Sequence, residues 1–500
     1  AIVTLGWVTL SSCGSIPYLL VGGTAADGSA LALGPVDAFF ETVSGLTTTG
    51  STILPDIEAY GHGLLFWRSM TQWIGGMGIV VLTVAILPSI GAGGYQLVRA
   101  EIPGPTADKI APRIAQTAKI LWTIYLGLTF SVILLLWAPS WFGPSEVTGT
   151  LEPSPAVSAA EGSDSGVSDG ETSHNYRSRT TQMDLYESVL HAFTTVATGG
   201  FSPRNGSMAA FSPYHQWVVI VFMFLSGVNF LLHWQLIMGR AALVAKNSEL
   251  RVYASTVGIA ALLVALGLVF LPVYESQGHG DDRGWPPVET DSPAHPEPPP
   301  TVEDDPPHET DYETAESTIR HALFQVLAIM TTTGYATSDY DGWPDALRLL
   351  LVILMVTGAC AGSTSGSLKI IRVMVIAKHA FTEVRRLIFP HEVNHVRVGG
   401  ERVPDRVVGA IIGAFTFYLL LLLVGALILS VLPGFDLETA FTASMTTISN
   451  VGPGMSGVGP TEHFGWIDPV GKVVCSFLML LGRLEIYTVL VLLYPAMYRR

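Results

Sequence analysis

Four short stretches of the chain combine glycine with small polar residues and could bind a cation through their backbone carbonyls. We number them the first to fourth turns: residues 47–50 (Thr-Thr-Thr-Gly), 197–200 (Ala-Thr-Gly-Gly), 331–334 (Thr-Thr-Thr-Gly) and 449–452 (Ser-Asn-Val-Gly). Glycine adopts positive φ angles at little steric cost, so it can aim a carbonyl where other residues cannot. Successive carbonyls can replace the hydration shell of a monovalent ion. No carboxylate lies within the four turns, which disfavours a Ca²⁺ or Mg²⁺ site.

The predicted cation site is the backbone at the end of each turn. It consists of Thr49, Gly50, Gly199, Gly200, Thr333, Gly334, Val451 and Gly452. We expect it to hold a monovalent cation only. The fourth turn lacks threonine, so the four quarters of the site are not expected to be equivalent.

Each turn follows an apolar run that is too short to cross a membrane. Residues 37–46 would give about three helical turns, or ~15 Å, which is half of a hydrocarbon core of ~30 Å. The other short helices are predicted at 185–196, 318–330 and 437–448, with Asp184, Thr318 and Asp436 as N-cap residues. Non-helical backbone at membrane depth is tolerated only where it is buried in protein or lines water, so the turns should meet in one cavity. The C-termini of the short helices would add partial negative charge there, which favours cations.

Composition identifies the chain as a polytopic helical membrane protein. Only 13% of its residues are charged. Apolar runs of about 20 residues, long enough to cross a bilayer, recur; they include 119–137, 252–274, 407–432 and 473–495. A soluble protein with this sequence would need several buried, wholly apolar helices, so we reject that class.

The order of helix, short helix, turn and helix occurs four times. The long helices are predicted at 2–22 and 64–87, 113–138 and 214–240, 252–274 and 345–378, and 406–432 and 466–496. The predicted fold class is therefore an all-α polytopic membrane protein with eight transmembrane helices and four short pore helices. The corresponding repeats are residues 1–90, 113–240, 252–390 and 406–500. Because residue 1 already lies inside an apolar run, we expect further residues upstream.

Charge is distributed unevenly and predicts the topology. Residues 140–184 hold seven acidic and two basic side chains, and residues 275–316 hold thirteen and one. Both stretches lack periodic apolar residues and are predicted to be loosely ordered; a high-salt habitat and ordinary loop variation explain their acidity equally well. Seventeen of the 26 Lys and Arg residues lie in the basic connections at 91–119, 240–251 and 369–406 and at the C-terminus. The positive-inside rule places these in the cytoplasm, and the acidic loops and turns outside.

Other reactive residues show no pattern of known chemistry. Cys13, Cys360 and Cys475 lie in apolar segments and have neither disulfide nor metal-site spacing. His391 and His395 are spaced like two ligands on a helix, but they lie in a charged connection after a proline, so no zinc site is expected. We predict no enzyme activity, no covalent cofactor and no nucleic-acid partner.

Four motifs, one in each repeat, carry a family resemblance. They are residues 72–78 (QWIGGMG), 197–202 (ATGGFS), 358–366 (GACAGSTSG) and 480–485 (LLGRLE). The chain resembles the Trk/Ktr/HKT superfamily of potassium transporters, and most closely its TrkH branch, over essentially its whole length. The resemblance implies four M1–P–M2 units around a pseudo-fourfold pore, a homodimer, and a cytoplasmic TrkA-type regulatory subunit through which alone a nucleotide would act. It also implies that the glycines at 50, 200, 334 and 452 occupy the filter position of each unit, where glycine favours K⁺ over Na⁺.

Small residues interrupt a predicted helix of the third repeat. This 358–366 segment consists of Gly358, Ala359, Cys360, Ala361, Gly362, Ser363, Thr364, Ser365 and Gly366. Such a run loosens a helix, because glycine has high backbone entropy and hydroxyl groups compete for backbone hydrogen bonds. The resemblance implies an intramembrane loop beneath the filter, and we interpret it as the gate. The alternative is a small-residue packing face between helices.

Two basic residues of the last helix are candidate control elements. A charge in mid-membrane costs ~2.5–3.5 kcal/mol, so Arg483 should face the pore or a partner. The resemblance implies a place beside the 358–366 segment, where Arg483 would hold that segment and repel cations. The alternative is a structural bond to a backbone carbonyl. Lys472, nearer the outside, is predicted to support the filter from behind.

The predicted function is K⁺ uptake down the electrochemical gradient through a gated pore in the cell membrane. A Na⁺-permeable protein or a proton- or Na⁺-coupled K⁺ symporter is the alternative within transport. A membrane subunit for sensing or scaffolding is the alternative from another class. The sequence leaves channel and symport mechanisms open.

Overall fold

The computed structural model describes residues 2–24, 30–31, 33–86, 114–142, 182–271, 314–392 and 394–484. Most of both acidic loops, most of the basic connection at 91–119, and residues 485–500 lie outside these ranges. The predictions made for them, and the repeat boundaries, stay predictions.

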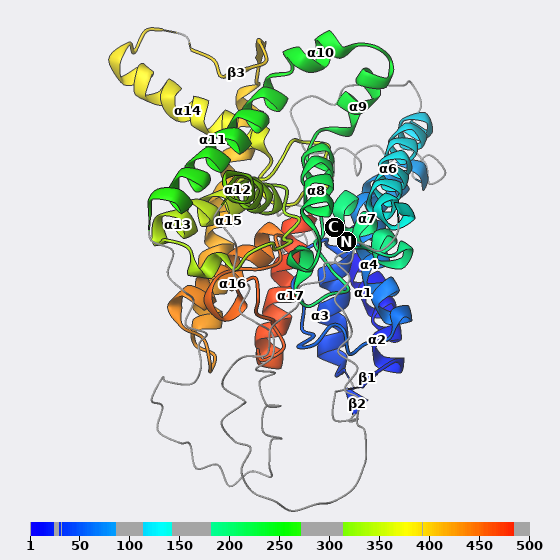
Figure 1. Ribbon diagram of the computed structural model, residues 1–500. Helices are drawn as coiled ribbons and strands as arrows, with labels where there is room; N and C mark the ends of the chain where they lie inside the picture. Colours follow the sequence, from blue (N-terminus) through cyan, green and yellow to red (C-terminus); the bar gives the residue numbers. More distant parts are fainter. Residues whose placement is uncertain are drawn as a thin grey trace, which may run out of the picture.

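The described chain is built almost entirely of helices (Figure 1). Its first part contains α1 (Ile2–Gly14), α2 (Ile16–Leu20), β1 (Gly23–Thr24), β2 (Ala30–Leu31), α3 (Pro35–Leu46) and α4 (His62–Ile86). The next contains α6 (Ile114–Trp137), η2 (Ala138–Phe142), α7 (Leu185–Ala197), η3 (Ser207–Ala210), α8 (Pro213–Ser226), α9 (Phe230–Ile237) and α10 (Ala241–Lys246). The third contains α11 (Ser248–Phe270), α12 (Ala315–Met330), η4 (Tyr340–Gly342), α13 (Asp345–Val356) and α14 (Ile370–Ile388). The last contains β3 (Arg397–Val398), β4 (Glu401–Arg402), α15 (Asp405–Ser430), α16 (Leu437–Ser449), η5 (Ser456–Val458) and α17 (Pro469–Arg483).

Three helical segments in the described residues are long and apolar enough to cross a membrane by themselves. They are Ala118–Trp141, Ser248–Phe270 and Asp405–Ser430. Most residues in these segments are not buried inside the molecule, as expected for helices that face lipid. α8 and α9 pass the same criteria when they are counted together, as one span with a bend of 98°.

The predicted continuous helix at 214–240 is wrong. The chain bends between α8 and α9, at residues 227–229. The Asn229 side chain caps α9 by accepting a hydrogen bond from Leu231 N at 2.9 Å. The backbone of the 358–366 segment takes part in the bend: Gly227 O accepts from Cys360 N, and Phe230 N donates to Gly362 O, both at 3.0 Å. The bend thus depends on a segment far away in sequence.

The predicted interruption of the third-repeat helix is confirmed. α13 ends at Val356 and α14 starts at Ile370. Between them the chain closes on itself, because Gly358 N donates to Leu368 O at 2.7 Å and Ile370 N donates to Ala359 O at 3.1 Å. These bonds hold the 358–366 segment as a compact loop.

The four short helices α3, α7, α12 and α16 begin with the expected kinds of residue. Asp184 makes a complete capping box with Glu187, and Asp436 accepts from Thr439 N at 2.7 Å. α3 has no side-chain cap but begins with Pro35, whose missing N–H is not needed there. The predicted N-cap Thr318 is wrong. Thr314 caps α12, which starts one turn earlier, because its hydroxyl accepts from Ser317 N at 3.1 Å.

The short helices are arranged in a closed circle. α7 packs on α4, α12 on α8, α16 on α13, and α3 on α17, so the last described helix closes on the first short one. β1, β2 and α2 lie at one end of the molecule, and α9, α10, α14 and β3 at the other (Figure 1). The circle of short helices lies between these two ends and positions the four turns.

Candidate functional site: a ring of four turns

Each short helix ends in the same unusual backbone conformation. Thr48, Thr198, Thr332 and Asn450 have φ between 53° and 59°, the left-handed region. Two residues later Gly50, Gly200, Gly334 and Gly452 have φ of 89°, 79°, 72° and 109°. A side chain is strained at such angles, so the glycines are required by the backbone itself.

The four turns touch one another in sequence order and form a ring. A Cβ atom placed on Gly50 would lie 2.3 Å from Gly199 O, and one on Gly200 would lie 1.8 Å from Thr333 O. One on Gly334 would lie 2.1 Å from Val451 O, and one on Gly452 would lie 2.7 Å from Thr49 O. Every residue of the predicted cation site is therefore brought into this ring. Each glycine leaves room for the carbonyl of the next turn.

The quarters of the ring are supported in different ways. In the first turn the Thr47 and Thr49 hydroxyls are 2.7 Å apart, and Thr331 and Thr333 repeat this pair in the third turn. In the second turn Gly199 O accepts from Gln72 Nε2 at 2.6 Å. In the fourth turn Gly452 O accepts from the hydroxyls of Ser51 and Thr446, both at 2.9 Å.

Asn450 gives the fourth turn a contact that a threonine could not make. Its Nδ2 donates to Thr49 Oγ1 and to Met479 O, both at 2.9 Å. The amide side chain thereby fastens the fourth turn to the first turn and to α17. The fourth turn thus has asparagine where the other turns have threonine, and this asparagine joins the last turn of the ring to the first.

A cavity of about 120 Å³ opens on the glycine side of the ring and is lined by Gly50, Gly200, Gly334 and Gly452 together. Arg68, Arg204, Glu462 and His463 also line it. Burial and, after it, the charge of Lys472 lower the pKa of His463, so its imidazole is neutral near pH 7 and adds no positive charge to the cavity.

A buried ion pair lies behind the first and second turns. Arg68 and Glu41 are 2% and 0% exposed, and Arg68 Nε lies 2.7 Å from Glu41 Oε1. Arg68 also donates to Ser202 O at 2.8 Å, while Glu41 Oε2 accepts from Ile53 N at 2.9 Å. The pair thus joins the chain that follows the first turn to the chain that follows the second. Sequence reasoning missed this pair, although each of the two apolar segments contains a charged residue, and such a residue needs a partner.

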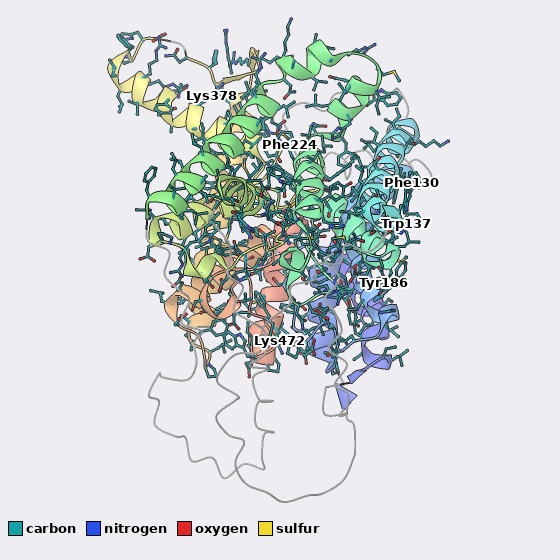
Figure 2. The ribbon with its side chains drawn as sticks, in the orientation of Figure 1. Phe130, Trp137, Tyr186, Phe224, Lys378 and Lys472 are labelled. Carbon is teal, nitrogen blue, oxygen red and sulfur yellow. The ribbon has the colours of Figure 1, made fainter. Side chains whose placement is uncertain are left out.

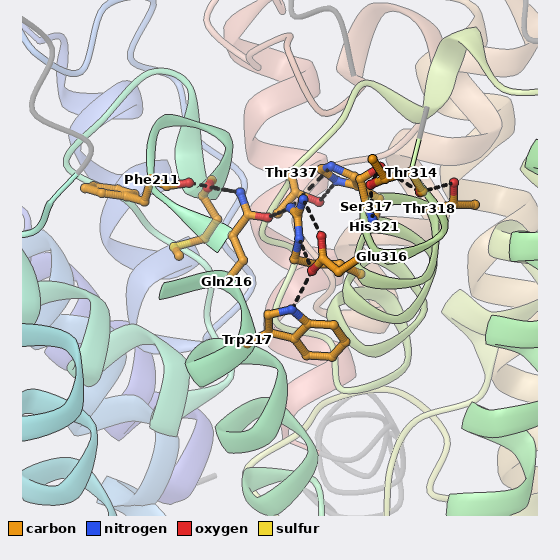
Figure 3. Close-up of polar contacts among 11 residues, drawn as sticks. Phe211, Gln216, Trp217, Thr314, Glu316, Ser317, Thr318, His321 and Thr337 are labelled. Atoms are coloured by element: carbon orange, nitrogen blue, oxygen red, sulfur yellow. Dashed lines mark hydrogen bonds and ion pairs between the residues drawn. The ribbon is translucent and has the colours of Figure 1, made fainter. Parts of the chain in front are cut away.

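A second polar network supports the third turn (Figure 3). Arg320 pairs with Glu316 at 3.0 Å and also donates to Gln216 on α8. Trp217 Nε1 donates to the same carboxylate at 2.7 Å. The neighbouring His321 bonds through Nδ1 to the Thr337 hydroxyl at 2.9 Å, three residues beyond Gly334. This network ties α12 to α8, and sequence reasoning did not find it.

Lys472 lies close to the start of α3 rather than at the ring. Its Nζ is 2.6 Å from Asp37 Oδ1 and donates to Gly465 O at 2.8 Å. The side chain is largely buried, at one end of the molecule (Figure 2). Lys472 therefore joins α17 to the first turn of α3, the short helix that carries the first turn of the ring.

Replacing Lys472 by methionine is expected to lower the free energy of unfolding by about 1–3 kcal/mol, because Asp37 loses its buried cation. Thermal unfolding of the purified protein measures the effect. Lys119→Met, an exposed site on α6, is the control. If the pair acts as a unit, adding Asp37→Asn should destabilise Lys472→Met no further. A melting curve for Lys472→Met that matches the control would contradict this role.

The 358–366 segment lies against the opposite side of the ring from the cavity. Thr364 Oγ1 donates to Val196 O at 3.0 Å, and Gly366 N donates to Thr332 Oγ1 at 2.7 Å. Val196 is at the end of α7, and Thr332 starts the third turn just after α12. The segment thus packs on the helix ends, whereas the cavity borders the glycines.

Arg483 lies beside the 358–366 segment. Its Nη1 donates to Thr364 O at 2.9 Å, and its Nη2 donates to Gly75 O at 3.0 Å. One guanidinium therefore joins the segment to α4.

Lys369 and Glu249 contact the same segment, and sequence reasoning missed both. Lys369 was counted among the cytoplasmic cations, yet it is 7% exposed and donates to Ser365 Oγ at 3.0 Å. Glu249 is also 7% exposed and accepts from Ala361 N at 2.6 Å. No cluster that could hold a metal ion occurs among the described residues, which include His391 and His395.

Helices long and apolar enough to cross a membrane, in a chain that is almost entirely helical, are typical of an all-α membrane protein. A family model described as a cation transport protein, TrkH, matches residues 1–256 and 310–497. The chain belongs to the TrkH family of cation transport proteins.

Named relatives cover the whole chain. The Trk system potassium uptake protein TrkH of Escherichia coli K12 is 34% identical over 501 residues, covering 100% of this chain and 85% of the relative. The Trk system potassium uptake protein TrkI of Halomonas elongata is 31% identical, covering 100% and 83%. The crystal structure of the potassium transporter TrkH from Vibrio parahaemolyticus matches with a TM-score of 0.72 and 32% identity, covering 99% of this chain and 84% of that one.

Proposed function

We propose that this protein takes up K⁺ across the cell membrane through the ring of four turns. The observation that carries the proposal is the closed contact of each filter glycine with the backbone of the next turn. The relatives are named as potassium uptake proteins. In this proposal the chain forms four M1–P–M2 repeats, with eight transmembrane helices and four pore helices around a pseudo-fourfold axis.

Ions enter through the cavity on the glycine side and lose water to the carbonyls of the ring. Among the described residues, no hydrogen bond is made to the carbonyl oxygens of Thr49, Thr333 and Val451, so these are free to bind an ion. The C-termini of the four short helices end at the ring and favour a cation there. Glycine at all four filter positions favours K⁺ over Na⁺.

The 358–366 segment is the gate in this proposal. It packs against the inner side of the ring, where it would block an ion that has passed the filter. Arg483 would hold the segment by its bond to Thr364 O and repel cations.

The orientation and partners belong to the same proposal. The end of the molecule with α10 and α14 faces the cytoplasm, since it carries the basic connections, and the cavity and acidic loops face outward. The protein works as a homodimer with a TrkA-type cytoplasmic subunit, which would supply any nucleotide response.

Two measurements test the function. Expression in cells that lack K⁺ uptake systems should restore growth at limiting K⁺, whereas a sensing or scaffold subunit would not. Flux in liposomes, driven by K⁺ or Na⁺ gradients with and without a proton gradient, separates a K⁺ pore from a Na⁺-permeable protein or a coupled symporter. If the protein neither restores growth at limiting K⁺ nor conducts K⁺ in liposomes, the proposal is wrong.

A further inference from the structure

Glu249 is a buried carboxylate at the cytoplasmic start of α11 in the proposed orientation. It is the second residue of the helix, and Asn247 fixes the helix start by accepting a hydrogen bond from Leu250 N at 2.9 Å. A buried carboxylate is unfavourable unless it is bonded or paired. Here Oε1 accepts from Ala361 N at 2.6 Å, in the middle of the 358–366 segment.

The bond between Glu249 and Ala361 differs from the other hydrogen bonds of the 358–366 segment. Thr332, Val196 and the α8–α9 bend hold it from the ring and from the neighbouring repeat. Glu249 instead holds it from a helix start that is connected directly to α10. Arg251 Nε donates to Ala245 O at 2.8 Å, so the first turn of α11 is fastened to the end of α10. α10 lies at the end of the molecule away from β1 and β2 (Figure 1).

We propose that Glu249 is a positioning residue that holds the 358–366 segment closed and couples it to the α10–α11 connection. The bond between Glu249 and Ala361 is the latch. A shift of the connection that withdraws the carboxylate leaves a buried N–H without an acceptor, which disfavours the closed segment. The inference rests on the proposed function and adds a route by which an event at the cytoplasmic surface reaches the gate.

The competing explanation is that Glu249 only stabilises its own helix, as an acidic residue in a first turn does. That role predicts lower thermal stability without any change in flux. The latch predicts increased flux, because the closed state alone contains the bond. A charge-assisted hydrogen bond is strong enough for its loss to raise the open population about tenfold or more.

The test compares Glu249→Met with Glu249→Gln in the purified full chain, reconstituted in liposomes. Methionine keeps the length of the side chain without an acceptor oxygen, and glutamine keeps an acceptor. We expect Glu249→Met to raise basal K⁺ flux about tenfold and Glu249→Gln to raise it much less. The K⁺/Na⁺ ratio should not change in either, because the ring is untouched. Glu401→Met, which removes an exposed carboxylate from β4, should conduct like the unchanged protein.

A variant lacking residues 362–364 distinguishes a failure of the proposed latch from a failure of the proposed pore. If this variant conducts freely and folded Glu249→Met conducts like the unchanged protein, the latch is overturned and the proposed pore stands. If neither the shortened variant nor the unchanged protein conducts, the proposed function itself fails. If Glu249→Met does not fold, deuterium exchange of Arg251→Met decides, because this exposed site carries the bond that fastens α11 to α10. Faster exchange at residues 357–369 supports the latch, and unchanged protection overturns it.

Discussion

Replacing Gly200 by alanine should lower K⁺ uptake by about a hundredfold or more. A Cβ atom on Gly200 would lie 1.8 Å from Thr333 O, and the residue has φ of 79°. The new methyl group therefore meets backbone rather than a flexible side chain, and the third turn must move. Since Thr333 O is one of the carbonyls proposed to bind the ion, the displacement acts on the site itself. Uptake of a K⁺ tracer by cells that depend on this protein measures the loss.

The matched control is Gly258→Ala, on the exposed face of α11. A Cβ atom there has no neighbour within 4 Å, so uptake should be unaffected. Gly452→Ala should be milder than Gly200→Ala, because its Cβ would lie 2.7 Å from the nearest carbonyl oxygen. Equal activity of Gly200→Ala and Gly258→Ala in protein of equal abundance would refute the assignment of the ring.

The same geometry bears on Gly334. Because glycine at the filter position is expected to favour K⁺ over Na⁺, replacing Gly334 by serine should weaken that preference. In the structure a Cβ on Gly334 would lie 2.1 Å from Val451 O. Serine would therefore disturb the fourth turn as well, and total uptake should fall together with the selectivity.

Replacing Arg483 by glutamine should raise basal K⁺ flux by about ten- to a hundredfold. The guanidinium joins Thr364 O to Gly75 O and Gly76 O at 2.9, 3.0 and 3.4 Å. Glutamine is shorter and uncharged, so it cannot span these carbonyls, and it no longer repels a cation. Flux from liposomes loaded with K⁺, without any regulatory subunit, measures the change.

Arg406→Gln is the control, because Arg406 is exposed at the start of α15. A purely structural role for Arg483 predicts a lower melting temperature with flux at or below the original level. A gate role predicts higher flux even where the melting temperature also falls. Measuring both quantities on one preparation therefore separates the two interpretations of this residue.

The sequence predicted those features that depend on short stretches of chain. The four turns were visible because glycine follows a short apolar run each time, and Asp184 and Asp436 signalled helix starts correctly. The interruption at 358–366 was predictable because a run of nine small residues, rich in glycine and hydroxyl side chains, has low helix propensity. In each case the residues that produce the feature lie within about one helical turn of it.

Features that depend on distant partners were not predictable in this way. The bend after Ser226 needs the backbone of Cys360 and Gly362 to bond with it. Arg68 and Glu41 are 27 residues apart and meet only because α3 packs on α4. Lys369 looked like a surface cation because a charge count carries no information about burial. Thr318 failed as a cap because Thr314, one turn earlier, offers the same chemistry.

The two hydrogen bonds of Asn450 make one contact of the ring different from the other three. Each joint between neighbouring turns brings a glycine against a carbonyl oxygen of the next turn, so it leaves no room for a side chain at the glycine. Asn450 spans one joint with its amide and reaches both Thr49 and α17. Asn450 thereby adds a side-chain hydrogen bond to the glycine contact between the fourth and first turns. A change at residue 450 should therefore loosen both that contact and the packing of the fourth turn on α17.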